Sequence, residues 1–279
     1  MTIKTNNALT KILIYSVLII AAALVLIPVL WMISTSLKIP KETFASPPSW
    51  IPKTPTLAAY NTIWNEYPFP QYFRNSIVVT VGSLIVTLII SSLTGYGLTR
   101  FRFRGKESIA GFILITQMFP SVMLLIPYYT LLGTYGLNDS LIGLMIVYIS
   151  FKVPFCSWMM VGYFKTVPLE LDEAARIDGC SRLKTFWKVV LPMTLPGLAA
   201  CGIYGFITSW NEYMFANLLM TDPLMKTVPV GIATFNGNDV IMWNELMGAS
   251  VLSSMPLVIA FLFMQKYFIS GLTAGAVKS

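Results

Sequence analysis

The sequence has no histidine and few charged residues. Only 11% of its 279 residues are charged and 56% are hydrophobic, whereas an ordinary soluble domain carries about a quarter charged residues. So few charges cannot cover a soluble surface, and we therefore expect the outer surface to face lipid. The lack of histidine removes the commonest metal ligand and the usual general base near neutral pH. The sequence predicts neither a metal site nor a catalytic group.

Three further absences narrow the class of protein. Cys156, Cys180 and Cys201 show no CxxC spacing, so we interpret them as small buried residues. No Gly-x4-Gly-Lys-Ser/Thr phosphate loop is present, and we do not expect this chain to bind ATP itself. Strict alternation of polar and apolar residues is also missing, which argues against a β-barrel. An all-α membrane protein is the class that remains.

Long apolar runs occupy much of the chain. A helix needs about 20 apolar residues to cross roughly 30 Å of hydrocarbon. Six stretches meet this length, at about residues 12–33, 76–98, 109–132, 141–164, 196–219 and 247–268. The first is too long for a signal-peptide core, so we expect it to be retained as an anchor helix. We predict one transmembrane domain over residues 1–279, with six transmembrane helices, in the cell (inner or cytoplasmic) membrane.

The distribution of basic residues predicts the orientation. With the N-terminus inside, thirteen lysines and arginines fall on the inner side and five on the outer side, and Lys152 lies within the fourth span. Basic residues favour the cytoplasmic side, so we expect the N and C termini inside. The cluster from Arg100 to Lys106 contributes strongly to the count of inner basic residues, and we interpret it as a lipid-headgroup anchor. In this setting the net charge of +7 indicates cytoplasmic loops rather than a nucleic-acid partner.

The one long inner segment, residues 165–195, has the pattern of a helix-turn-helix. Pro168 suits the first turn of a helix, three acidic residues follow within five positions, and Gly179 suits a left-handed stop. Ser181 is a good cap for a second helix over residues 182–190, which we expect to end before Leu191-Pro192. On spacing alone, an interfacial hairpin without a partner explains this segment as well as a docking element does.

Polar residues inside the spans indicate a pathway or an interhelical contact. Trp210, Asn211, Glu212 and Tyr213 place aromatic rings beside an amide and a carboxylate in the fifth span, which is the chemistry that binds sugars. Gln117 is a second polar residue of this kind. The alternative is that Glu212 joins helices, through Lys152 or through a backbone group.

Residues of the inner segment resemble the EAA signature of ABC importer permeases. Glu173-Ala174-Ala175 is followed after three residues by Gly179 and after nine more by Val189-Val190-Leu191-Pro192. Val189 stands where the family usually has isoleucine. The resemblance implies an ATPase-coupling loop over residues 165–195. The residues it marks for coupling are Glu173, Ala174, Ala175, Asp178, Gly179, Leu191 and Pro192.

The likeness extends over nearly the whole chain. It includes Gln117-Met118-Phe119-Pro120, Gly136 to Ser140, Ser209 to Glu212 and Gly271 to Lys278, which resemble the smaller permease subunit of maltose-type and multiple-sugar importers. The likeness places an ABC permease core at residues 72–270. It also places Phe235, Asn236, Gly237 and Asn238 in the loop that contacts the binding protein.

The resemblance implies a set of partners and a function. These partners are a second homologous permease, two ATP-binding subunits that hold ATP and Mg²⁺, an extracytoplasmic sugar-binding protein and membrane lipids. The expected function is that of a pore subunit, not an enzyme, in an ATP-driven importer of sugars, di- or oligosaccharides in particular. Two alternatives stay open: a permease of the same superfamily for glycerol phosphate or another solute, and a stand-alone secondary transporter or channel, which would show an internal repeat.

Overall fold

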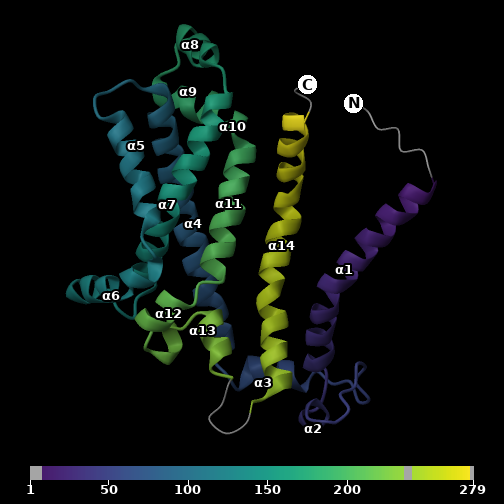
Figure 1. The fold of residues 1–279 in the computed structure, drawn as a ribbon. Coiled ribbons are helices and arrows are strands. Elements are labelled where there is room, and N and C mark those ends of the chain that lie inside the picture. Colours follow the sequence, from purple (N-terminus) through teal and green to yellow (C-terminus); the bar gives the residue numbers. More distant parts are fainter. Residues whose placement is uncertain (1–7, 236–240, 277–279) are drawn as a thin grey trace. The chain divides into compact units, whose positions relative to one another are not determined.

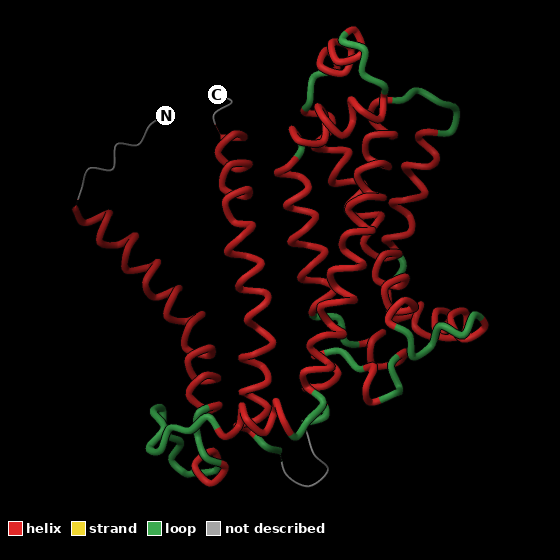
Figure 2. The backbone as a smooth tube through the Cα atoms, turned by 180° about the vertical axis from the view of Figure 1, so that it is seen from behind, coloured by secondary structure: helices red, strands yellow, loops and turns green. Residues whose placement is uncertain are grey.

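A computed structural model of the chain describes residues 8–235 and 241–276. These residues form helices joined by loops, with no strand among them (Figure 2). They divide into two compact units. The first combines the described residues up to Pro68 with those of 232–254, and the second combines 69–231 with the residues from Met255 onward.

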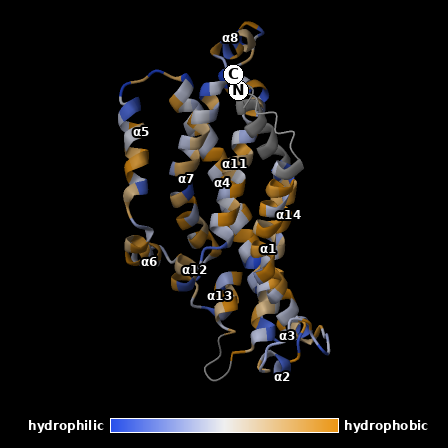
Figure 3. Ribbon diagram, turned by 45° about the vertical axis from the view of Figure 1, so that its right-hand side comes forward, coloured by the Kyte–Doolittle hydropathy of each residue, from blue (hydrophilic) through white to orange (hydrophobic). Residues whose placement is uncertain are grey.

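The first unit contains α1 (Ala8–Ser36), α2 (Pro40–Thr43), α3 (Ala58–Asn65) and the beginning of α14 (Trp243–Ala276). The most apolar window of α1 has none of its residues buried, and Figure 3 colours much of this helix as hydrophobic. An apolar helix with outward-facing side chains is stable only where lipid or another apolar surface surrounds it. α1 therefore has the character of a membrane helix.

The loop after α1 is held by buried charges. Lys38 donates from Nζ to the carbonyl oxygen of Ser49 at 2.6 Å and lies 4.3 Å from the ring centroid of Trp31. The carboxylate of Glu42 accepts from the backbone N–H of Lys53 at 2.8 Å and from the hydroxyl of Ser49 at 2.9 Å. The backbone hydrogen bond from Lys53, the largest effect, and the Ser49 hydroxyl lower the pKa of Glu42.

The second unit carries most of the other helices. They are α4 (Phe69–Arg100), α5 (Lys106–Ile115), α6 (Leu125–Thr134), α7 (Leu141–Thr166), α8 (Leu169–Ile177), α9 (Arg182–Thr185), α10 (Leu191–Met193), α11 (Leu195–Trp210) and α12 (Met214–Leu219). The short α13 (Val228–Ala233) begins in this unit. 3-10 turns cover Thr116–Met118, Ser121–Leu124 and Pro223–Met225, and a π-helical turn covers Phe186–Val190.

The core of this unit is the bundle of α4, α7 and α11, which lie side by side in Figure 1. Small residues allow the helices to approach closely. A Cβ on Gly95 would lie 2.8 Å from Cβ of Met160, and a Cβ on Gly205 would lie 2.7 Å from a methyl group of Leu84. Small side chains at helix contacts are the usual solution in membranes, where packing replaces the hydrophobic driving force.

Four of the six predicted spans lie within continuous helices. α1, α4, α7 and α14 are long and apolar enough to cross a membrane, and two bent pairs would bring the total to six. The predicted span 109–132 is bent by 93° between Lys106–Met118 and Ser121–Thr134. The second bent pair is Arg182–Met193 with Leu195–Trp210, at 78°. The predicted span 196–219 begins within this pair and is interrupted after Trp210. The total of six spans and the sides of the termini stay predictions.

Pro120 explains the break in the third predicted span. Proline has no N–H to continue the ladder, and its ring drives the preceding residue out of the helical region. Phe119 has φ −78° and ψ 127°, an extended conformation, and a new turn starts at Ser121. The bend therefore follows from a local steric effect.

The loop before α7 is tied to the end of α12. Asp139 has a positive φ of 53°, and its carboxylate accepts from the backbone N–H groups of Thr221 and Asp222 at 2.6 and 2.8 Å. Its own N–H donates to the carbonyl oxygen of Leu219 at 2.9 Å. Partial burial acts to raise the pKa of Asp139, but hydrogen bonds, above all from the Thr221 hydroxyl, lower it on balance.

The segment 165–195 folds as two short helical arms: the first arm is α8 (Leu169–Ile177), and the second arm is Arg182–Met193. Gly179 has φ +82° and the hydroxyl of Ser181 accepts from the N–H of Lys184 at 3.3 Å, as predicted. The predicted end of the second arm before Leu191 is wrong, since α10 continues the arm to Met193. The N–H of Leu191 reaches back five residues to Phe186, and this wider turn accommodates Pro192, whose ring would clash in an unbroken α-helix.

Candidate functional site

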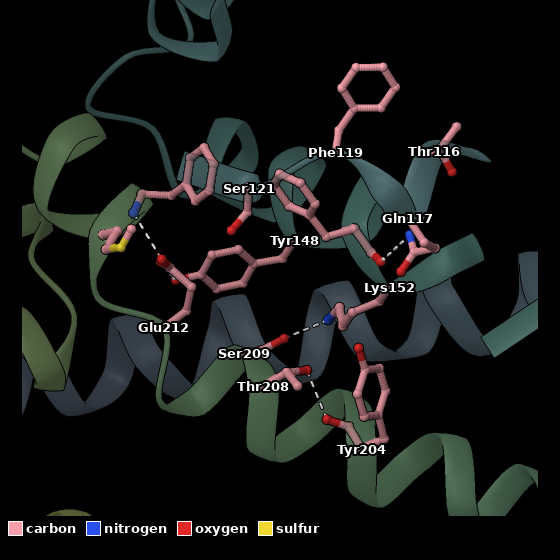
Figure 4. A pocket seen from close by; sticks show the side chains of 13 residues that line it. Thr116, Gln117, Phe119, Ser121, Tyr148, Lys152, Tyr204, Thr208, Ser209 and Glu212 are labelled. Carbon is pink, nitrogen blue, oxygen red and sulfur yellow. Dashed lines mark hydrogen bonds between the residues drawn. The ribbon is translucent and has the colours of Figure 1, made fainter. Parts of the chain in front are cut away.

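A cavity of about 350 Å³ opens in the second unit (Figure 4). It lies where both broken helices end, beside the middle of α7. Irregular backbone at membrane depth is tolerated where it lines a cavity or is buried in protein. The cavity is lined by Thr116, Gln117, Phe119, Ser121, Tyr148, Phe151, Lys152, Tyr204, Thr208, Ser209, Glu212, Met214 and Phe215.

Glu212 holds the start of α12. Its Oε2 accepts from the hydroxyl of Tyr148 at 2.8 Å and from the N–H of Ala216 at 3.0 Å, and its Oε1 accepts from the N–H of Phe215 at 2.8 Å. The first N–H groups of a helix have no partner within the helix, and a carboxylate there satisfies them and suits the positive end of the dipole. Glu212 does contact backbone groups, but these belong to α12 directly after it, and its link to another helix is the Tyr148 hydroxyl rather than a backbone group.

Lys152 is the cation of the cavity lining. Its side chain comes from the middle of α7 and is only 4% exposed. Nζ donates to Oγ of Ser83 on α4 at 2.8 Å and to Oγ of Ser209 on α11 at 2.6 Å. The alternative pairing of Lys152 with Glu212 is wrong, because each charge is held by other partners. The ammonium has three donors, and these two bonds employ two of them.

Of the predicted pathway residues, some line the cavity and others do not. Gln117 and Glu212 line the cavity, and Gln117 lies 3.5 Å from the carbonyl oxygen of Phe151. Trp210 is 1% exposed and its ring stacks on Phe206, with centroids 5.8 Å apart. Asn211 and Tyr213 are exposed and are not part of the cavity lining.

Sequence reasoning missed several polar residues of the cavity. Tyr148, Tyr204, Thr208 and Ser209 all line it, yet hydroxyl groups are common in membrane helices and give no distinct signal. Lys152 did give one, because a lysine in the middle of an apolar run is costly and marks a polar cavity or a partner. Lys152 was therefore visible in the sequence as an unusual residue, but no pathway role was predicted for it.

The helical arms of residues 165–195 expose most of the residues that the EAA resemblance marks. Glu173, Ala174, Asp178, Gly179 and Pro192 are exposed, Leu191 is half-buried and Ala175 is buried. Large apolar side chains beside them are exposed as well, with Ile177 at 87% and Leu183 at 62%. Exposed apolar side chains gathered in one region are typical of an interaction surface.

The side chain of Arg100 is buried against protein groups and does not face outward as a lipid-headgroup anchor would. Its Nε lies 3.0 Å from Oδ2 of Asp172 on α8, and its Nη2 donates to the carbonyl oxygen of Val167 at 2.9 Å. The side chains of Arg100 and Asp172 are only 7% and 14% exposed. The interpretation of this residue as a lipid contact is therefore wrong, whereas Arg102 and Arg104 of the same cluster are exposed.

The predicted binding-protein contact lies largely outside the described residues. Phe235 is buried, with its ring centroid 4.6 Å from that of Tyr67. Asn236, Gly237 and Asn238 lie in the part of the chain that the structure does not describe. Among the described residues, no group of three or more acidic or cysteine side chains is placed to hold a metal ion.

Comparison with known proteins places this geometry in a family. Residues 87–273 match the family model of the "binding-protein-dependent transport system inner membrane component". The trehalose/maltose transport system permease protein MalG of Thermococcus litoralis is 38% identical over 98% of this chain and 99% of its own length. The maltodextrin transport system permease protein MdxG of Bacillus subtilis is 32% identical over the full length of both chains.

One further relative and one solved structure extend the comparison. The sulfoquinovosyl glycerol transport system permease protein SmoH of Agrobacterium fabrum is 34% identical over 93% of this chain and 92% of its own. A chain of a bacterial ABC transporter for the acidic polysaccharide alginate has the same fold, with a TM-score of 0.82, 24% identity and coverage of 96% and 99%. The chain therefore belongs to the family of inner membrane components of binding-protein-dependent transport systems.

Proposed function

We propose that this chain forms one half of the pore of an ATP-driven, binding-protein-dependent importer of sugars. The observation that carries the proposal is the pair of helical arms in residues 165–195, which present Ile177 and Leu183 to the surroundings. An apolar surface of this kind favours a protein partner. In the proposed assembly the partner is an ATP-hydrolysing subunit, which holds ATP and Mg²⁺ while this chain binds neither.

The proposed topology has six spans with both termini in the cytoplasm. The permease core is residues 72–270, and residues 165–195 form its coupling loop on the cytoplasmic side. A second permease completes the pore, two ATP-binding subunits drive it, and an extracytoplasmic binding protein delivers the cargo. The basic residues of the chain and its family support this arrangement.

The proposed cargo is a di- or oligosaccharide. Relatives named for trehalose/maltose and maltodextrin transport support this class, and a fold neighbour is described in complex with a periplasmic protein bound to an alginate pentasaccharide. The cavity offers aromatic rings such as Tyr148 and Tyr204 beside the charges of Glu212 and Lys152. Such a lining suits a ligand with apolar faces and many hydroxyl groups.

Purification and reconstitution test the proposal. The tagged chain, isolated in mild detergent, should bring with it an ATPase and a second permease, both identifiable by mass spectrometry. In liposomes, uptake of labelled trehalose, maltose or maltodextrin should require ATP and the binding protein. A chain that purifies alone and transports without ATP would be a secondary transporter or channel. ATP-driven uptake of glycerol phosphate instead of these sugars would reject the cargo class alone.

A further inference from the structure

The first arm of residues 165–195 is bound to the end of α4 by three side chains. Asp172 of α8 accepts from the hydroxyl of Tyr96 through Oδ1 at 3.0 Å and pairs with Nε of Arg100 through Oδ2 at 3.0 Å. Arg100 also donates to the carbonyl oxygen of Val167, at the junction of α7 and α8. We name Tyr96, Arg100 and Asp172 the tether. Because the ion pair is sheltered from water, its interaction is less screened than that of a surface pair.

The second arm meets the same tyrosine. The ring centroid of Tyr96 lies 4.9 Å from that of Phe186, which belongs to the π-helical turn and is buried. It also lies 5.8 Å from that of Phe164 on α7. One residue of α4 thus contacts the first arm through its hydroxyl and the second arm through its ring. The two arms are held to α4 as one body.

The backbone that joins the arms to α7 and α11 is not helical at either junction. Between α7 and α8 the backbone is extended at Val167 and Pro168. After the second arm the chain turns by 78° at Thr194, which has φ −99° and ψ 16°. Non-helical junctions of this kind absorb changes of angle, as hinges do. A movement of the arms would therefore reach the bundle more directly through the tether than along the chain.

α4 continues without interruption from the tether to the cavity. Ser83, which accepts from Lys152 of the cavity lining, precedes Tyr96 by 13 residues on α4. At a rise of about 1.5 Å per residue the two positions are about 20 Å apart along one helix. The close approach of Gly95 to Met160 fixes this end of α4 against α7. A rigid element thus connects the arms to the side chains that surround the cavity.

We propose that Tyr96 and Arg100 are positioning residues that make α4 the element through which movement of the coupling arms reaches the cavity. The inference rests on the proposed function and adds to it the route of transmission. A conformational change at one site alters another only when a linked element responds to both. Without the hydroxyl contact and the ion pair of the tether, closure of the ATPase would move the arms about their hinges and pass less of that movement to α4, which would keep only the ring contact with Phe186.

The test compares variants of the reconstituted importer. Tyr96→Phe removes the hydroxyl and keeps the ring against Phe186, and Arg100→Gln removes the ion pair. Arg102→Gln is the matched control, because Arg102 lies two residues from Arg100 and is exposed. Copurified ATPase, ATP hydrolysis and labelled sugar uptake are measured for each. The decisive quantity is the amount of sugar transported per ATP hydrolysed.

We expect both tether variants to retain the ATPase and to hydrolyse ATP while the sugar transported per ATP falls at least fivefold. Arg100→Lys should recover part of the lost transport per ATP, and Arg102→Gln should match the wild type. An unchanged ratio in Tyr96→Phe and Arg100→Gln overturns the inference. If Arg100→Gln does not fold, Tyr96→Phe decides alone. A wild-type chain without an ATPase or ATP-driven uptake would instead refute the proposed function.

Discussion

Replacing Glu212 with glutamine leaves one acceptor oxygen where the structure uses two. Oε1 accepts from the N–H of Phe215, while Oε2 accepts from the N–H of Ala216 and from the hydroxyl of Tyr148. A glutamine side chain has the same shape, but one of its terminal atoms is an NH₂ donor. In either orientation, this donor faces a backbone N–H. The start of α12 therefore loses one hydrogen bond that no rotation restores.

The size of the effect follows from these contacts. A buried N–H without a partner costs about 1–3 kcal/mol, and loss of a negative charge at a helix N-terminus costs about 0.3–1 kcal/mol. Together they predict that Glu212→Gln destabilises the second unit by about 1.3–4 kcal/mol. Asn211 is exposed and outside the cavity lining, so Asn211→Ala should change stability by no more than about 0.5 kcal/mol.

Thermal unfolding and sugar uptake of the purified assembly measure both effects. Glu212→Gln should lower the unfolding midpoint clearly and reduce uptake, because the start of α12 forms part of the cavity wall. Asn211→Ala, the neighbouring control, should leave both close to the wild type. If Glu212→Gln unfolds and transports like the wild type, the carboxylate does not support the cavity and the reasoning fails.

Three other positions give separate tests. Lys152→Met should keep or raise the stability of the protein, because a buried ammonium is costly to desolvate. It should slow uptake about tenfold, because the cargo loses one hydrogen bond to a charged group. Gly179 has φ +82°, and valine in this conformation should destabilise the turn by about 1 kcal/mol or more. Gly179→Val should therefore weaken copurification of the ATPase and leave membrane insertion intact. Because hydrogen bonds, above all from Thr221, lower the pKa of Asp139, its stabilising effect should be complete above about pH 4 and disappear as pH falls through the lowered pKa. The difference in melting temperature between wild type and Asp139→Asn should shrink over that range, and a constant difference would contradict this account.

Local chemistry made much of the fold predictable. Apolar length predicted α1, α4, α7 and α14, because a membrane helix requires a continuous run of side chains that lipid tolerates. Gly179 and Ser181 were also predictable, since a left-handed turn and a helix cap depend on neighbours in sequence. Pro120 was visible and its ring accounts for the break, but a proline alone does not specify a bend of 93°.

The candidate site was less predictable because it depends on the direction of side chains. Trp210 and Glu212 are two residues apart, yet the first is buried against aromatic rings and the second faces the cavity. Arg100 and Arg102 look alike in sequence, and only packing against α8 pairs the first with Asp172. These differences arise between elements distant in sequence, where a hydropathy pattern carries no information.

The π-helical turn at Phe186–Val190 constrains how this segment can change in length. Such a turn holds one residue more than the α-helical path would need. Deleting a single residue there would return the segment to regular α-helical winding, in which the ring of Pro192 clashes with the carbonyl group four residues earlier and kinks the chain. Ser209 and Glu212 lie downstream and would then have to find new partners. Homologous chains that share this cavity should therefore keep the spacing between the second arm and α11, even where the residues themselves differ.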